Sequence, residues 1–202
     1  MPTSDDWGDL PGRLFVISGA SGTGKSTLAR RLVARPEVGA VLSVSATTRA
    51  PRPGERDGVD YYFYDRDRFA SARQHDEFLE SAEVHGNSYG TPAGPVRDLL
   101  ASGRCVILEI DVQGGFQVRG HVPSAMLIFV QAPDAEALEA RLRGRAGDDD
   151  PTIRRRLANA AAEIAEASRY DVQVVNDDLE RAEHELVALL QRSGCGGPDP
   201  DA

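Results

Sequence analysis

The chain contains a single lysine, Lys25, and the residues around it constrain the fold more than any other feature of the sequence. A short apolar run, Leu14–Ile17, leads into residues 19–26, which read GASGTGKS and match the pattern G-x-x-x-x-G-K-[ST]. Beyond the motif, apolar residues recur at helical spacing as far as Val33. A buried strand that enters a glycine-rich turn and leaves it as a helix is the setting in which this motif binds phosphate groups. The pattern therefore predicts a nucleoside triphosphate site at the start of an α/β domain.

Each residue type in this motif has a chemical reason to be there. The glycines let backbone N–H groups turn toward phosphate oxygens without Cβ collisions. Lys25 brings a compact charge to the β- and γ-phosphates, and the Ser26 hydroxyl can ligate Mg²⁺. The other 22 of the 23 Lys+Arg residues are arginines, whose planar fork would fit so tight a loop poorly. The residues expected to bind the phosphates of the nucleoside triphosphate are Gly19, Ala20, Ser21, Gly22, Thr23, Gly24, Lys25, Ser26 and Thr27.

Charge and composition narrow the class of protein. The 202 residues are 41% hydrophobic, which is ordinary for a globular domain, and the net charge of −9 argues against a general nucleic-acid binder. Local arginine clusters can still hold a small anion; they lie at residues 49–56, 141–145 and 154–156. For these clusters, phosphate binding and a solvated surface are equally open interpretations. We expect small-molecule substrates and no nucleic-acid partner.

The N-terminus and the cysteines bear on localisation. Residues 1–9 are polar and acidic, without a basic-then-apolar signal pattern, and the longest apolar run, Ala125–Val130, is too short to span a bilayer. Cys105 lies in a strand-like run and Cys195 in an expected tail, so the two do not suggest a disulfide framework. We therefore expect a cytoplasmic protein with no membrane partner.

Strands and helices alternate along most of the chain. Apolar runs suited to buried strands stand at Leu14–Ile17, Val106–Ile110, Met126–Val130 and Val172–Val175. Helical patterns are expected at about 25–35, 134–143, 152–168 and 179–191. This alternation predicts a parallel sheet with helices on both faces.

Two segments break the alternation. Residues 40–95 hold four of the five tyrosines, many Gly and Pro, and short alternating runs, which predicts an inserted antiparallel lobe. Residues 144–151 lack apolar anchors between two arginine-bearing helices, which predicts a mobile lid. The expected organisation is a flexible leader over 1–12, a core of 13–40 and 96–193, the lobe at about 41–95, the lid at about 143–155 and a disordered tail over 194–202.

The inserted lobe contains the elements of a second site. Arg49 and Arg52 flank a proline-stiffened turn, so two guanidinium groups are held near each other at little entropic cost. Such a pair suits a phosphate monoester dianion. Residues 77–80 and 85–91 add carboxylates, hydroxyls and a phenol. A carboxylate can accept hydrogen bonds from two N–H groups of guanine, whereas adenine lacks that donor pair.

Together these stretches resemble guanylate kinase, the family that phosphorylates GMP at the expense of ATP. The resemblance covers nearly all of residues 13–191 and is carried by SGASGTGKST, SVSATTRAPRPGE, DGVDYYF, VILEIDVQG, RLRGR and VVNDDL. It implies a P-loop NTPase-type parallel sheet with flanking helices, an inserted antiparallel GMP-binding lobe and a mobile lid. The resemblance implies that the GMP phosphate is bound by Arg49, Arg52, Tyr61 and Tyr89, and that the guanine is bound by Ser45, Glu80 and Thr91.

The resemblance also implies roles around the transferred phosphoryl group. Glu109 and Asp111, which end a strand on one face of it, are placed beside GMP and the water shell of Mg²⁺. The alternative is that the two carboxylates simply orient neighbouring arginines. Asn176 is placed on the adenine side. The residues implied to act in catalysis are Lys25, Arg49, Arg141, Arg145 and Arg156.

The expected reaction is in-line transfer of the γ-phosphoryl group of ATP to GMP, without a strong general base. One alternative is a kinase of the same architecture that acts on another phosphorylated acceptor, such as a sugar phosphate. The other is a non-catalytic scaffold module related to guanylate kinase, which the intact Lys25 and Ser26 argue against. The oligomeric state is left open. The four histidines lack metal-ligand spacing, so no zinc site is expected.

Overall fold

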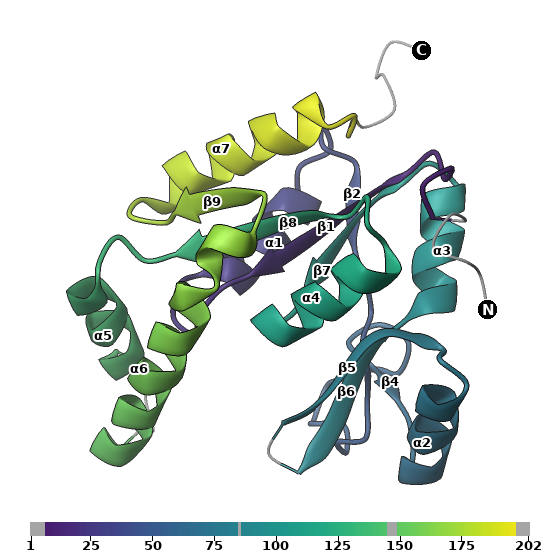
Figure 1. Cartoon of the computed structure of the whole chain (residues 1–202), viewed down its shortest axis with the longest axis horizontal. Coiled ribbons are helices and arrows are strands. Elements are labelled where there is room, and N and C mark those ends of the chain that lie inside the picture. Colours follow the sequence, from purple (N-terminus) through teal and green to yellow (C-terminus); the bar gives the residue numbers. More distant parts are fainter. Residues whose placement is uncertain (1–6, 85, 145–148, 197–202) are drawn as a thin grey trace.

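The computed structural model describes residues 7–84, 86–144 and 149–196, and its core is a five-stranded parallel sheet (Figure 1). The strands lie in the order β2-β7-β1-β8-β9, and every neighbouring pair is parallel. Their bounds are β1 Arg13–Ser18, β2 Ala40–Leu42, β7 Cys105–Glu109, β8 Met126–Gln131 and β9 Val172–Val175. The predicted α/β class with a parallel sheet is confirmed.

The central strands are buried on both faces because apolar side chains alternate between two cores. On β1, Leu14 and Val16 pack into one core, while Phe15 and Ile17 pack into the other. Helices α3 (Ala93–Ala101) and α4 (Val112–His121) contribute to the first core. Helices α1 (Lys25–Val33) and α7 (Leu179–Arg192) contribute to the second, and Figure 1 shows α7 lying along its face of the sheet.

The inserted lobe has a small sheet of its own, placed beyond one end of α4 in Figure 1. Its strands, in the order β4-β3-β6-β5, are β3 Ala46–Thr47, β4 Tyr62–Phe63, β5 Phe78–Val84 and β6 Asn87–Pro92. Pairs β5–β6 and β3–β6 are antiparallel as predicted, but β3 and β4 run parallel. The lobe also contains helix α2 (Arg66–Gln74), whose Phe69 stacks on Phe78 with ring centroids 4.6 Å apart.

Helices α5 (Ala135–Arg143) and α6 (Asp150–Ala165) form a pair that projects from the main sheet (Figure 1). Asp134 and Asp149 cap their N-termini by accepting hydrogen bonds from backbone N–H groups. Arg143 donates to both Glu139 and Asp150, which ties the end of one helix to the start of the other. Residues 145–148 of the expected lid, including Arg145, lie outside the described residues, so the lid stays a prediction.

The sequence patterns missed β2 and helices α2, α3 and α4. Strand β2 has three residues, too few to show a period. Helix α3 begins with a Gly and a Pro, and α4 has two glycines in its first turns, so both read as loops on propensity alone. Tertiary packing against the sheet decides these segments.

The described parts of the expected leader and tail, residues 7–12 and 194–196, are packed against the domain. Trp7 is buried in the core with Leu100, and the Gly12 N–H donates to the Leu100 carbonyl. At the other end Cys195 is buried and forms a disulfide with Cys105 of β7, 90 residues earlier in the chain. The expectation that the two cysteines form no disulfide framework is therefore wrong.

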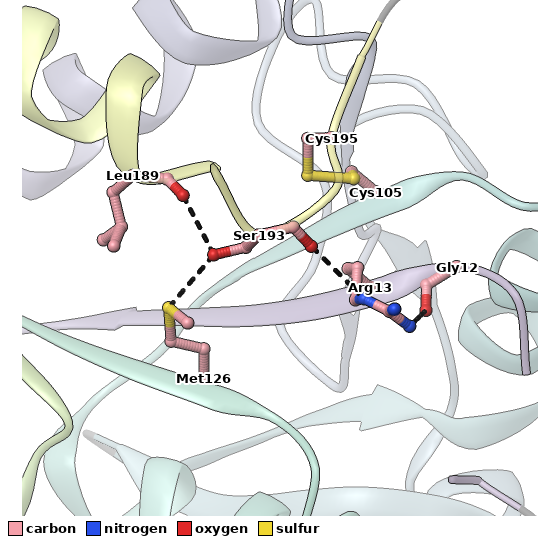
Figure 2. Close-up of a disulfide and its surroundings, with 7 residues drawn as sticks. All are labelled: Gly12, Arg13, Cys105, Met126, Leu189, Ser193 and Cys195. Carbon is pink, nitrogen blue, oxygen red and sulfur yellow. Dashed lines mark hydrogen bonds between the residues drawn. A yellow bond between two sulfur atoms is a disulfide. The ribbon is translucent and has the colours of Figure 1, made fainter. Parts of the chain in front are cut away.

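Figure 2 shows how the chain reaches this disulfide after α7. The Ser193 hydroxyl donates to the Leu189 carbonyl at 2.9 Å, and the Ser193 carbonyl accepts from Arg13 at 3.2 Å. The Cys195 N–H donates to Leu190. The segment after α7 is therefore fixed to the amino-terminal ends of β1 and β7 as far as Cys195. Sequence distance hid the pairing, because only the fold brings β7 and the end of α7 together.

Within the described ranges, no helix combines the length and the apolar character needed to cross a membrane.

Candidate functional site

The glycine-rich loop runs from the end of β1 to the start of α1, as the motif predicts. Gly19 has a φ of 144°, and a Cβ there would lie 2.1 Å from the Val130 carbonyl oxygen. Gly24 has a φ of 90° and is the N-cap of α1, so Lys25 and Ser26 form the first turn of that helix. The N-terminus of α1 presents unpaired backbone N–H groups and a positive dipole end to the loop, which suits an anion.

Asn176, at the end of β9, holds this loop from the side. Its buried side-chain amide donates to the Thr23 carbonyl at 2.7 Å. A Cβ on Gly24 would lie 2.4 Å from the same amide nitrogen, so glycine is needed there for the close approach. The Asn176 carbonyl accepts a hydrogen bond from Arg141 of α5 at 2.8 Å. Asn176 thus links the loop to the α5–α6 pair, a contact that sequence reasoning did not foresee.

Ser26 and Glu109 meet at the carboxyl end of the sheet. The Ser26 hydroxyl donates to the Glu109 carboxylate, which stands at the end of β7 beside β1. A hydroxyl and a carboxylate oxygen are hard donors of the kind that Mg²⁺ takes, with phosphate oxygens and water completing its shell. The residues present therefore fit the expected metal. Among the described residues there is no cluster of three or more His, Cys, Asp or Glu side chains that could hold a metal alone.

A cavity of about 440 Å³ lies next to this pair, between the main sheet and the inserted lobe. Its walls are polar and carry three arginines, three carboxylates and two tyrosines. The lining residues are Arg30, Leu42, Ser43, Ser45, Arg49, Arg52, Glu55, Val59, Asp60, Tyr61, Tyr89 and Glu109. The structure thus brings together Ser45, Arg49, Arg52, Tyr61, Tyr89 and Glu109 from the predicted GMP-binding set.

Arg49 is held in place by its neighbours in the lobe. Its guanidinium donates to both carboxylate oxygens of Glu55, at 2.9 and 3.0 Å. The hydrogen bond from Arg49, reinforced by the Arg52 backbone N–H, lowers the pKa of Glu55. Arg49 also lies 5.3 Å from the ring centroid of Tyr61, and the Tyr61 and Tyr89 rings meet edge to face. The lobe therefore pre-orients its cation and phenols before any ligand arrives.

Glu80 lies deeper in the lobe, on β5, and does not line the cavity. It is 7% exposed and accepts a hydrogen bond from the Thr91 hydroxyl on β6 at 2.7 Å. Burial, with a smaller contribution from the nearby Asp111, raises the pKa of Glu80 to about 7. Asp111 caps α4 by accepting from the Gly114 N–H, and a Cβ on Gly114 would lie 3.0 Å from Glu80. The predicted Glu80, Thr91 and Asp111 are thus close together.

The predicted phosphoryl-side arginines are divided between elements. Arg141 lies at the loop through its hydrogen bond to Asn176. Arg156 is half-buried on α6, while its neighbours Arg154 and Arg155 are exposed, as expected for consecutive residues on a helix. Arg145 lies outside the described residues.

Sequence reasoning missed part of the cavity lining. Two of the missed lining residues, Arg30 and Glu55, could have been identified from their spacing to predicted site residues. Arg30 follows Ser26 by four residues, so both lie on one face of α1. Glu55 follows Arg49 in the proline-rich turn and is its natural counter-ion. Asp60 and Val59 carried no comparable signal.

The chain is similar in sequence to known proteins of one family. The sequence model of the guanylate kinase family matches residues 11–193. A guanylate kinase from Rubrobacter xylanophilus is 50% identical over 190 residues, covering 94% of this chain and 98% of the relative. One from Synechocystis sp. is 46% identical, covering 92% and 96%.

The fold of the chain is similar to that of solved structures. The crystal structure of guanylate kinase from Anaplasma phagocytophilum matches with a TM-score of 0.71 and 33% identity, covering 94% of this chain and 88% of that one. An unliganded sugar kinase from Janibacter sp. matches at 17% identity with a TM-score of 0.51, a likeness of fold alone.

Proposed function

The chain belongs to the guanylate kinase family, and from this premise we propose that it transfers the γ-phosphoryl group of ATP to GMP, giving ADP and GDP. ATP and GMP are its small-molecule substrates. The sugar-phosphate kinase and scaffold alternatives are not favoured, because the curated relatives that match over most of the chain are guanylate kinases.

The observation that carries the proposal is the contact between Ser26 and Glu109. Ser26 belongs to the triphosphate loop, whereas Glu109 lines the cavity that holds the paired arginines. A donor site and an acceptor site for two phosphates therefore share a wall. This is the arrangement that transfer between two anions requires, because alignment supplies much of the rate.

In the proposed reaction a phosphate oxygen of GMP attacks the γ-phosphorus, and the bond from that phosphorus to the β-γ bridging oxygen breaks. The electron pair leaves on ADP. No strong base is needed, because the acceptor phosphate is already ionised near neutral pH. Lys25 would neutralise the β- and γ-phosphates, and Arg141 and Arg156 would stabilise the charge on the transferred group. Arg145 belongs to the same proposal.

The acceptor is held at two ends in this proposal. Arg49, Arg52, Tyr61 and Tyr89 would bind the phosphate of GMP, supported by their common position in the cavity. Glu80, which accepts a hydrogen bond from Thr91, would accept the guanine N–H groups, and Ser45 and Thr91 would contact the same base. Asp111, next to Glu80, would act on the same nucleotide.

Mg²⁺ would be held by the Ser26 hydroxyl and the phosphate oxygens, with Glu109 contacting its water shell. When bound it neutralises phosphate charge. Asn176 would support the adenine side in addition to holding the loop. We place the reaction in the cytoplasm, where both nucleotides are available.

The test is ADP release with Mg-ATP and each of GMP, AMP, CMP, UMP and a sugar monophosphate as acceptor. We expect turnover with GMP to exceed that with every other acceptor by about 100-fold or more, since a site built to hydrogen-bond one base leaves buried groups unpaired with another. Equal turnover with AMP would remove the guanine assignment of Glu80. Turnover with the sugar phosphate alone would overturn the proposed function.

A further inference from the structure

The cavity between sheet and lobe is lined by cations from both the lobe and the core. Its lobe side carries Arg49 and Arg52. Its core side is formed by Leu42 and Ser43 at the end of β2, by Glu109 at the end of β7, and by Arg30 of α1. Arg30 is therefore the basic residue that the core contributes to the lining.

The register of α1 directs Arg30 toward this cavity. Arg30 follows Ser26 by one helical turn, and the Ser26 hydroxyl already contacts Glu109 on the same wall. Arg31, the next residue, lies about 100° around the helix and pairs instead with Glu183 of α7 at 2.8 Å. Leu28 and Leu32 cover the sheet. Of the described residues of α1, Arg30 is the one that lines the cavity.

The charges of the lining show why such a cation matters. Three arginines are balanced by Glu55, Asp60 and Glu109, so the walls carry no net charge when all six groups are ionised. Arg49 is largely committed to Glu55 through its two hydrogen bonds. Arg30 is exposed and forms no ion pair with any residue in the described ranges. Without Arg30 the cavity would be net negative, a poor environment for a phosphate dianion.

We propose that Arg30 binds the acceptor phosphate from the core side, opposite Arg49 and Arg52, and so turns it toward the γ-phosphate at the loop. The ligand class is the 5′-phosphate of a nucleoside monophosphate, and the inference rests on the proposed function. Arg30 stands one turn from Ser26 on α1 and lines the same cavity as the paired arginines of the lobe. It is therefore placed to hold the acceptor oxygen in line for attack.

The test compares Arg30→Gln and Arg30→Lys with a matched control, Arg192→Gln. Gln keeps much of the length and polarity of Arg30 but removes its charge, and Lys keeps the charge without the planar fork. Arg192 is an exposed arginine in the last turn of α7, outside both sites, so its loss controls for net charge. For each variant the KM for GMP, the KM for ATP, kcat and the melting temperature are measured. Binding of guanosine, which lacks the phosphate, is measured by competition.

We expect Arg30→Gln to raise the KM for GMP by about 10- to 100-fold, the loss typical of a hydrogen bond to a charged group. The KM for ATP, the melting temperature and guanosine binding should stay within about twofold of the wild type, and Arg30→Lys should recover part of the loss. Arg192→Gln should behave as the wild type in every assay.

Two results would overturn the inference. One is an unchanged KM for GMP in Arg30→Gln, which makes Arg30 a solvated surface residue. The other is an equal loss of GMP and guanosine binding, which makes its role structural. Failure of the proposed function is distinguishable, because there the wild type itself would not phosphorylate GMP.

Discussion

The triphosphate loop and the acceptor cavity differ in how the chain builds them. The loop is one continuous stretch, residues 19–27, placed between β1 and α1. The cavity draws its walls from residues spread between Arg30 and Glu109, on the main sheet, on α1 and on the lobe. A continuous stretch can be recognised from its residue pattern, whereas a cavity between the main sheet and the lobe exists only once both have folded.

The difference is not absolute, because the loop also depends on a distant residue. Asn176 lies 153 positions after Thr23, yet its amide donates to the Thr23 carbonyl. Its own carbonyl accepts from Arg141. The backbone of the loop is local, but its support is tertiary.

The largest effect is expected from Lys25. Because the triphosphate loop and the acceptor cavity are built separately, its loss should impair the ATP side alone. Lys25→Met should lower kcat by about 10²- to 10³-fold, because it removes a preorganised charge from the transferred phosphoryl group. Lys25→Arg should not restore activity, since its planar fork does not fit the tight loop. GMP affinity, measured calorimetrically without ATP, should change by less than about twofold. A large loss of GMP affinity would show that the two sites are not separable.

The next effect is a pH dependence confined to the acceptor side. The pKa of Glu80 is raised to about 7 by burial, so the fraction ionised rises about tenfold between pH 6 and pH 8. If the carboxylate accepts the guanine N–H groups, the KM for GMP should fall by about tenfold over that range, while the KM for ATP changes little.

The matched variant for this prediction is Glu80→Gln, which can still accept from Thr91 but cannot ionise. It should bind GMP weakly at pH 8 and should flatten the profile, while protonation of GMP itself is common to both proteins and cancels. The raised pKa also means that ionising Glu80 costs more in the folded than in the unfolded state. Stability should therefore fall as pH rises from about 4.5 to about 7, and Glu80→Gln should melt higher at pH 8. Identical KM profiles for variant and wild type would exclude Glu80 from guanine binding.

The smallest effect on either site is expected from the Cys105–Cys195 disulfide. It joins β7 to the segment after α7 and contributes no side chain to the cavity. Closing a 90-residue separation should stabilise the oxidised protein by about 2–4 kcal/mol. Dithiothreitol should therefore lower the melting temperature of the wild type, and leave kcat and both KM values nearly unchanged.

Cys195→Ser serves as the control for this reduction experiment. Its melting temperature should be the same with and without dithiothreitol, because it has no bond to lose. A wild type that is equally insensitive would show that the two thiols are not joined in solution.

Much of the fold could be predicted from the sequence. Strands at Leu14–Ile17 and Val172–Val175 and the helices that follow them lie where their periodicity placed them. Helices α3 and α4 could not be found in this way, because glycine and proline in their first turns obscure the pattern and packing on the sheet overrides propensity. Of the candidate site residues, Arg49 and Glu109 were found through motifs, whereas Arg30 had no motif of its own.

The sequence by itself determined that this chain has a triphosphate loop on a parallel sheet and an arginine-bearing lobe. It could do so because glycine geometry, helix start and strand period depend on contacts within a few residues. Tertiary structure alone decided that Ser26 meets Glu109, that Asn176 holds the loop, and that Cys195 reaches Cys105. Each of these contacts joins residues more than 80 positions apart. Burial and packing of the whole sheet, which no local pattern encodes, bring such pairs together.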